Sequence, residues 1–324
     1  MSITDMKKMR LGVVGVGYLG KFHAEKYAGM EHVDLVGVVD THRNIADGIA
    51  SRLGTQPFYH HQDLIGKVDA VSIAVPTSDH FVVSRDFLEN DIDVLIEKPI
   101  TTNLEEANEL IRLSESRGLI VQVGHLERFN PAVAALQGVV KKPMFIESHR
   151  LSIYKDRCMD VSVVLDLMIH DIDIILNFVK SDIKSIHASG ISVISNHVDI
   201  ANARLSFETG CVANVTASRI SIKNERKIRL FQKDAYISVD FANHDITLIR
   251  KNGTASGGIV PGADIQKLSF LKGDALEDEL TAFIKAITLR HAPEVTGQMG
   301  RDALKIALHI MDQIQATNSR YVSQ

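Results

Sequence analysis

The sequence is poor in cysteine and proline and has no low-complexity stretch. Its two cysteines, Cys158 and Cys211, form neither a CxxC pair nor a Cys/His spacing typical of zinc, which fits a reducing cytoplasm. Because prolines number only seven in 324 residues, a large disordered region is not expected. The chain is therefore expected to be an ordinary globular protein of the cytoplasm.

The sequence also lacks a basic patch and a long apolar run. The formal net charge is -4, and Lys141–Lys142 is a pair rather than a cluster, so there is no electrostatic footprint for nucleic acid. The longest apolar stretch, Val161–Val179, is interrupted by three aspartates and a histidine, so no membrane span is expected. Residues Met1–Arg10 are polar and charged, which predicts no signal peptide.

The first third of the chain alternates strand-like and helix-like segments. A length of 324 residues suggests two domains. The expected strands are apolar without a two-residue period, which favours a parallel sheet covered on both faces. These strands are Leu11–Val14, Val33–Val39, Val68–Val75, Val94–Ile96 and Leu119–Val123. Helices are expected between them, including His80–Glu89 and Leu104–Arg117.

The rhythm changes after Gly124. Helices are expected at Pro131–Val140 and Val161–Val179, on either side of an alternating strand at Phe145–Ile153. Successive strands with hairpin signals then fill residues 183–249 and predict an antiparallel sheet. Two further helices, at residues 277–289 and 301–317, close the chain. We expect a Rossmann domain at 1–123 and an α/β domain at 124–324, and leave open whether the last helix packs back on the first domain.

A glycine motif follows the first strand. Gly15-Val16-Gly17-Tyr18-Leu19-Gly20 matches GxGxxG, with a strand before it and a helix after it. This context indicates a dinucleotide-phosphate turn rather than a glycine turn without a ligand. Asp40 ends the second strand, and its carboxylate suits the adenosine ribose hydroxyls and repels a 2′-phosphate. NAD is therefore predicted, and Arg43 leaves NADP open as the alternative.

A lysine stands at the end of another strand. Glu97-Lys98-Pro99 follows Val94–Ile96 directly, so Lys98 lies at the carboxyl edge where parallel sheets bind ligands. Its ammonium can stabilise charge that develops on a hydroxyl during oxidation. The alternative is a surface lysine in a turn.

A polar stripe runs along the apolar helix. Asp166, His170, Asp173 and Asn177 are spaced four, three and four residues apart, which puts them on one helix face. Asp166 can orient His170 as a general base. A buried structural network is the alternative. A metal site would need converging ligands from elsewhere, and none can be identified.

Together these residues resemble a known family. The segments GVGYLGKFH (Gly15–His23), IAVPTSDH (Ile73–His80), EKP (Glu97–Pro99) and DLMIHDID (Asp166–Asp173) occur in this order. They resemble the glucose-fructose oxidoreductase, inositol dehydrogenase and MocA (Gfo/Idh/MocA) family over essentially the whole chain.

The resemblance implies a Rossmann domain followed by an α/β domain with an open, mostly antiparallel sheet, often used to form homodimers or homotetramers. It implies a catalytic group of Lys98, Asp166 and His170, and a Lys98–Pro99 peptide that is often cis. The nicotinamide would lie near Pro76, His80, Glu97 and Lys98.

The substrate class follows from the closest string. VVLDLMIHDIDIIL is most similar to the branch that oxidises the 3-hydroxyl of UDP-N-acetylglucosamine, although Val161–Leu165 lacks the glycines found in many members. Arg128, Arg150, Lys155 and Arg157 are then candidates for the diphosphate, or else solvated charges. The predicted substrate ligands are Arg128, Asn130, Tyr154, Arg157 and Asp173.

Two alternatives remain. An inositol or free-sugar dehydrogenase would use the same machinery. A non-catalytic NAD-binding regulator would have lost the lysine, aspartate or histidine, and all three are present.

Overall fold

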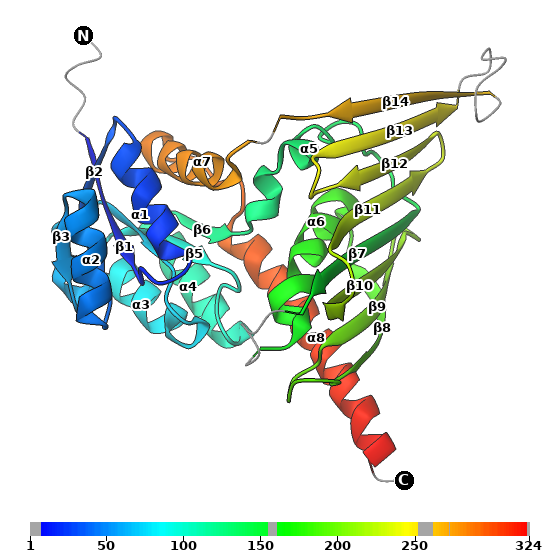
Figure 1. Ribbon diagram of the computed structural model, residues 1–324, viewed down its shortest axis with the longest axis horizontal. Helices are drawn as coiled ribbons and strands as arrows, with labels where there is room; N and C mark the ends of the chain where they lie inside the picture. Colours follow the sequence, from blue (N-terminus) through cyan, green and yellow to red (C-terminus); the bar gives the residue numbers. More distant parts are fainter. Residues whose placement is uncertain (1–7, 155–160, 252–261, 272, 323–324) are drawn as a thin grey trace. The chain divides into compact units, whose positions relative to one another are not determined.

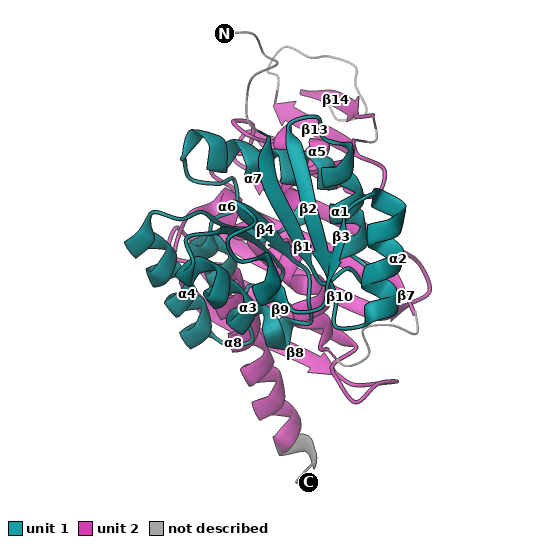
Figure 2. Ribbon diagram, turned by 90° about the vertical axis from the view of Figure 1, so that its left-hand side faces the viewer, with its two compact units in different colours: residues 1–126, 276–302 teal, residues 127–275, 303–324 magenta. Residues whose placement is uncertain are grey.

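The computed structural model describes residues 8–154, 161–251, 262–271 and 273–322 (Figure 1). The chain forms two compact units (Figure 2). Unit 1 combines Met1–Leu126 with Leu276–Asp302, and unit 2 combines Glu127–Ala275 with Ala303–Gln324. Three residues named above, Lys155, Arg157 and Cys158, lie outside the described residues.

Unit 1 is built on a parallel sheet of six strands in the order β3-β2-β1-β4-β5-β6, which confirms the predicted Rossmann architecture. The order reverses between β1 and β4, the position where doubly wound sheets bind ligands. The strands are β1 Met9–Val14, β2 Val33–Val39, β3 Gln56–Phe58, β4 Ala70–Ile73, β5 Asp93–Glu97 and β6 Val121–Gly124. The helices are α1 Gly20–Gly29, α2 Arg43–Leu53, α3 Thr77–Glu89, α4 Leu104–Arg117 and α7 Ala275–Leu289.

Burial on both faces explains why these strands read as continuous apolar runs. All four residues of β4 and all four of β6 are buried. The short edge strand β3 was not predicted, because three residues that include Pro57 carry no apolar run. Helix α4 begins where expected because the Asn103 side chain accepts the Glu106 N–H at 2.9 Å.

A C-terminal helix completes the core of unit 1. Leu280 and Phe283 of α7 are fully buried and share one apolar cluster with Leu11 and Val13 of β1. The C-terminal segment that belongs to unit 1 is therefore Leu276–Asp302, which contains α7 apart from Ala275 and the start of α8 (Gly297–Val322). The rest of α8 belongs to unit 2.

Unit 2 is built on an open eight-stranded sheet in the order β14-β13-β12-β11-β7-β10-β9-β8, as predicted mostly antiparallel. One pair is parallel: β7 lies between β11 and β10, so the two consecutive strands β10 and β11 do not form the expected hairpin. The strands are β7 Phe145–Ile153, β8 Ile183–Ile191, β9 Ile200–Phe207, β10 Val212–Ser221, β11 Glu225–Gln232, β12 Ala235–Asp240, β13 Asp245–Lys251 and the unpredicted β14 Ala263–Ser269.

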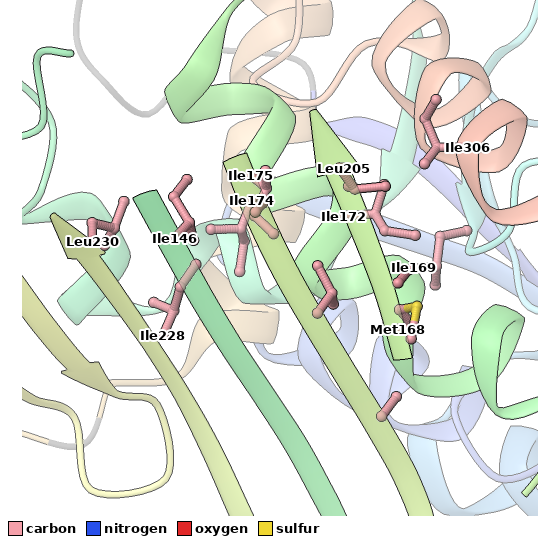
Figure 3. Close-up of a cluster of buried hydrophobic side chains, with 14 of the residues drawn as sticks. Ile146, Met168, Ile169, Ile172, Ile174, Ile175, Leu205, Ile228, Leu230 and Ile306 are labelled. Atoms are coloured by element: carbon pink, nitrogen blue, oxygen red, sulfur yellow. The ribbon is translucent and has the colours of Figure 1, made fainter. Parts of the chain in front are cut away.

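One face of this sheet carries the core of unit 2. Isoleucines of α6 (Ile169–Val179) meet Ile146 of β7, Leu205 of β9 and Ile228 of β11 in a buried cluster (Figure 3). Burial alternates along β9, with every second residue buried, so a two-residue period marks the strands of this half.

Two expected helices differ from the structure. The helix expected at 131–140 is only α5, Pro131–Ala134, and Gly138 beyond it has a positive φ of 78°. The long helix expected at 161–179 begins with a π-helical turn at Val164–Met168 before α6 continues it. Single π-helical turns inside helices often mark functional sites, so this turn, which holds Asp166, is notable. Within the described residues, no helix is both long and apolar enough to cross a membrane.

The packing of α7 gives a first prediction. Phe283→Ala removes a fully buried ring from the unit 1 core and should lower the free energy of unfolding by about 3–5 kcal/mol. Urea unfolding measures the loss, and hydrogen exchange of β1 should rise with it. The exposed Thr281→Ala on the same helix serves as the control and should change stability by less than about 0.5 kcal/mol. Unchanged exchange in β1 would contradict the placement of α7.

Candidate active site

The glycine turn between β1 and α1 is shaped by close backbone contacts. Gly15 has a φ of +81°, and a Cβ there would lie 2.7 Å from the Ala74 carbonyl oxygen. A Cβ on Gly20 would lie 1.8 Å from the Gly15 carbonyl oxygen, so the helix can approach the turn only without a side chain. Among the described residues, no atom lies within 4 Å of a Cβ built on Gly17. The turn therefore leaves an open backbone face suited to a pyrophosphate.

Asp40 connects this turn to strand β2. One carboxylate oxygen accepts the Val16 N–H at 3.1 Å, and the other accepts the His42 N–H at 2.9 Å. The side chain is 11% exposed, so it is fixed yet reaches the surface. Each carboxylate oxygen has lone pairs beyond these bonds, which can accept ribose hydroxyls. Tyr18 and Leu19, predicted with the motif, are exposed on the turn.

Arg43, the residue that keeps NADP as an alternative cofactor, is stacked on the ring of Tyr59. Its guanidinium lies 4.1 Å from the centroid of the Tyr59 ring, and the Tyr59 hydroxyl donates to Asp47 at 2.8 Å. This arrangement holds the arginine at the start of α2. It places one positive side chain three residues after Asp40.

The turn that carries Lys98 is held by a buried histidine. The two ring nitrogens of His80 face the carbonyl oxygens of Pro99 at 2.9 Å and Val75 at 3.0 Å. Burial lowers the pKa of His80, and the two carbonyls oppose this effect because only the imidazolium can donate to both. The Lys98–Pro99 peptide is cis, as the family resemblance implied. Pro76, at the start of α3, is exposed.

Glu97 forms a buried pair that the sequence did not reveal. Its Oε1 lies 3.1 Å from Nε2 of His23 on α1, and its Oε2 accepts the Lys98 backbone N–H at 3.3 Å. Burial raises the pKa of the Glu97 carboxyl, but the His23 hydrogen bond and charge outweigh it, and the pKa is lowered. Gly124 faces this carboxylate, since a Cβ there would lie 3.1 Å from Oε2. The residue before Lys98 is thus fixed on both oxygens.

In unit 2, Asp166 lies in the π-helical turn and His170 in the first turn of α6, both half-buried. The hydrogen bond between them stays a prediction. Within the described part of the chain, no cluster of three or more His, Cys, Asp or Glu side chains has the arrangement of a metal site.

Three predicted substrate ligands have partners inside unit 2. Arg128 Nε lies 3.0 Å from Asp173 Oδ2, and both side chains are buried. Asn130 is also buried and caps α5 by accepting the Ala132 N–H at 3.0 Å. Tyr154 is 40% exposed. The structure thus gives Arg128, Asn130 and Asp173 internal roles, and substrate binding by any of them stays a prediction.

A second buried network contains Asp171, which is not one of the four residues of the predicted stripe. Arg150 of β7 donates to Asp171 at 2.8 Å and to Glu127 at 2.8 Å. Burial raises the pKa of Glu127, but the Arg150 charge and hydrogen bond outweigh it and hold that pKa below its usual range. Arg150, predicted as a diphosphate candidate, is therefore bonded on two sides. The positive charge of Arg150 was the one feature in the sequence that could have indicated this network.

The parallel sheet, the open glycine turn and the carboxylate of Asp40 define a Rossmann-type dinucleotide-binding oxidoreductase. The chain belongs to the Gfo/Idh/MocA family. The family model described as "Oxidoreductase family, NAD-binding Rossmann fold" matches residues 9–125, and the GFO/IDH/MocA C-terminal domain matches residues 136–238.

Named relatives include several dehydrogenases. The UDP-N-acetylglucosamine 3-dehydrogenase of Acidithiobacillus ferrooxidans is 37% identical over 96% of this chain and 99% of its own. A solved structure of that enzyme superposes with a TM-score of 0.90 at 35% identity, over 96% of this chain and 99% of that one. The scyllo-inositol 2-dehydrogenase of Bacillus subtilis is 29% identical over 66% of this chain and 68% of its own.

The glycine turn generates a binding prediction. Gly20→Ala forces a methyl group against the Gly15 carbonyl and should weaken NAD binding about tenfold to a hundredfold, from an overpacking cost of about 1–3 kcal/mol. Isothermal titration calorimetry measures the change. Gly29→Ala, at the other end of α1, has open space around its Cβ among the described residues and should bind NAD normally. Normal binding by Gly20→Ala would refute this reading of the turn.

Proposed function

We propose that this protein is an NAD-dependent dehydrogenase that oxidises the 3-hydroxyl of UDP-N-acetylglucosamine. The supporting observation is its 37% identity, over nearly the full length of both chains, to an enzyme named for that reaction. All residues that the resemblance assigned to catalysis are present in this sequence. The product would be a 3-keto sugar nucleotide.

We assign removal of the substrate hydroxyl proton to the group formed by Lys98, Asp166 and His170. Oxidation of a secondary alcohol releases one hydride and one proton, and NAD, when bound, accepts the hydride. Lys98, at the carboxyl end of β5, would stabilise the developing alkoxide. His170, oriented by Asp166, would take the proton as general base. Glu97, His80 and Pro76 would line the nicotinamide side of the turn.

The cofactor is assigned as NAD rather than NADP. The Asp40 carboxylate is fixed by two backbone N–H groups next to the open glycine turn. Its oxygens suit the 2′- and 3′-hydroxyls of the adenosine ribose, and its charge opposes a 2′-phosphate. Gly15, Gly17, Tyr18, Leu19 and Gly20 would hold the pyrophosphate.

The proposed assembly follows from the family resemblance, and the proposed location follows from the cysteine usage of the sequence. We assign a homodimer or homotetramer formed through the open sheet of unit 2, in the cytoplasm, with a small sugar nucleotide as the binding partner. The second candidate function is an inositol dehydrogenase, which the 29% identity to the B. subtilis scyllo-inositol enzyme favours.

Substrate choice can be tested in a single-turnover assay. Excess enzyme and NAD should oxidise UDP-N-acetylglucosamine, with NADH absorbance and a two-hydrogen mass loss followed together. UDP, free N-acetylglucosamine, glucose and myo-inositol serve as controls. Lys98→Ala and His170→Ala should each lower turnover by about 10²–10⁴-fold and still bind NAD. Oxidation of inositol or free sugar instead would replace the assigned substrate, and active Lys98 and His170 variants would refute the catalytic group.

Cofactor choice depends on Asp40. Asp40→Ala removes a charged acceptor and should weaken NAD binding about tenfold to a hundredfold, because hydrogen bonds to charged groups contribute about 1.5–3 kcal/mol. The same change removes the repulsion of a 2′-phosphate, so the preference for NAD over NADP should narrow. Titrations with both cofactors measure this. Asp34→Ala, exposed on strand β2, is the matched control, and an unchanged preference for NAD over NADP in Asp40→Ala would exclude Asp40 as the selector.

A further inference from the structure

Glu279 is a carboxyl group fully buried in unit 1. It lies on α7, its side chain is 0% exposed, and neither carboxyl oxygen has a hydrogen-bond partner among the described residues. Its backbone carbonyl accepts the Gln122 side-chain N–H at 3.1 Å, which ties α7 to β6. An ionised carboxylate in such a place loses its hydration without gaining a partner, which is costly.

The charged neighbour of Glu279 is another carboxylate. Glu97, at the end of β5, acts on Glu279 electrostatically, and Glu279 in turn acts on the buried phenol of Tyr27 on α1. The described residues also contain no metal-binding cluster that would supply a compensating cation. Glu279 is fully buried without a donor among the described residues, and the negative charge of Glu97 opposes its ionisation, so one of the two carboxyl groups keeps a proton.

The surroundings decide which carboxyl keeps it. Glu97 receives His23 on one oxygen and the Lys98 backbone N–H on the other, and the charge of Lys98 also favours its ionised form. Glu279 has no such donors in the described part of the chain. The proton therefore belongs on Glu279 and the negative charge on Glu97.

We infer that Glu279 is a neutral carboxylic acid. Its bound proton lets Glu97 remain the one anion of the pair, and Glu97 holds His23 and the Lys98 backbone. Glu279 and Glu97 are therefore positioning residues for Lys98. The functional part of this inference rests on the proposed role of Lys98. Ionisation of Glu279 would set a second negative charge against that of Glu97, and this repulsion would push Glu97 away from its two donors.

This inference fixes the sign of a pH effect. Burial, with the Glu97 charge, raises the pKa of Glu279 well above its usual value of 4.5. The folded chain then keeps a proton that the unfolded chain has lost. Stability from this group is complete below pH 4.5 and falls as pH rises toward the folded-state pKa, by at most about tenfold in the unfolding constant per pH unit.

The first test needs no substrate. Full-length wild type, Glu279→Gln and Glu279→Met are unfolded in urea between pH 5 and pH 9, with Glu277→Gln on the exposed side of α7 as the matched control. The unfolding constant of wild type relative to Glu279→Gln or Glu279→Met should rise with pH, and that of Glu277→Gln should follow wild type. An infrared band of a protonated carboxyl should be present in wild type near neutral pH and lost in Glu279→Gln. Parallel pH profiles, or no such band, would overturn the inference.

The second test uses the proposed reaction. The kcat of wild type should fall at the pH where Glu279 ionises, and in Glu279→Gln this alkaline fall should move to higher pH with little change in KM. Glu277→Gln should keep the wild-type profile. If the alkaline fall of kcat in Glu279→Gln occurs at the same pH as in wild type, the positioning role is overturned. Absence of turnover in wild type would instead refute the proposed function, and the unfolding and infrared results would still decide where the proton resides.

Discussion

A buried carboxylate must have a donor or a cation beside it, and this constraint determines where the functional side chains of the chain lie. Burial of an unpaired charge costs more than most single contacts return, so an acidic group that stays ionised in the interior needs a partner at a defined position. Glu97 holds His23 and the Lys98 backbone, and Asp40 holds the glycine turn through the Val16 N–H. The turn and the lysine are thus positioned by acids that sit next to them.

The parallel sheet of unit 1 makes this arrangement possible. All its strands point the same way, so Gly15 after β1, Asp40 after β2 and Glu97 at the end of β5 lie along one edge. At this edge, the ligand position of doubly wound sheets is between β1 and β4, where the strand order reverses and the crossovers on either side diverge. His80 lies on α3, the helix that follows β4, and one of its ring nitrogens lies 2.9 Å from the Pro99 carbonyl oxygen. This contact holds the turn after β5 that carries Lys98.

The sequence predicted elements well where local chemistry decides them. Strands β2 and β7 and helix α4 have the predicted bounds, because apolar runs, alternation and the Asn103 cap are local signals. Strands β3 and β14 were missed because they are short or mostly exposed edge strands. The insertion of β7 between β10 and β11 depends on tertiary pairing, which no hairpin signal encodes.

The site shows the same division. The glycine turn, Asp40 and the position of Lys98 follow from motifs of adjacent residues, so the sequence located them. The partners of those residues are distant in the chain: His23 is 74 positions from Glu97, and Asp171 is 21 from Arg150. In the sequence, Glu279 does not differ from the other acidic residues of its amphipathic helix. Its burial becomes evident only from the packing of α7 in unit 1. Pairing of this kind is a tertiary property.

The acidic residues between Val164 and Val179 fall into two groups once their partners are known. Asp171 and Asp173 bind Arg150 and Arg128, and Glu127 joins them with Arg226 at 3.8 Å, so three carboxylates face three guanidinium groups. This balanced network anchors the helix to β7 and to residues 127–130. The Arg128 and Arg150 side chains thus already pair with carboxylates of their own unit. Within the stripe, the structural interpretation therefore applies to Asp173. The proposed chemistry is assigned to Asp166 in the π-helical turn and His170 in the first turn of α6.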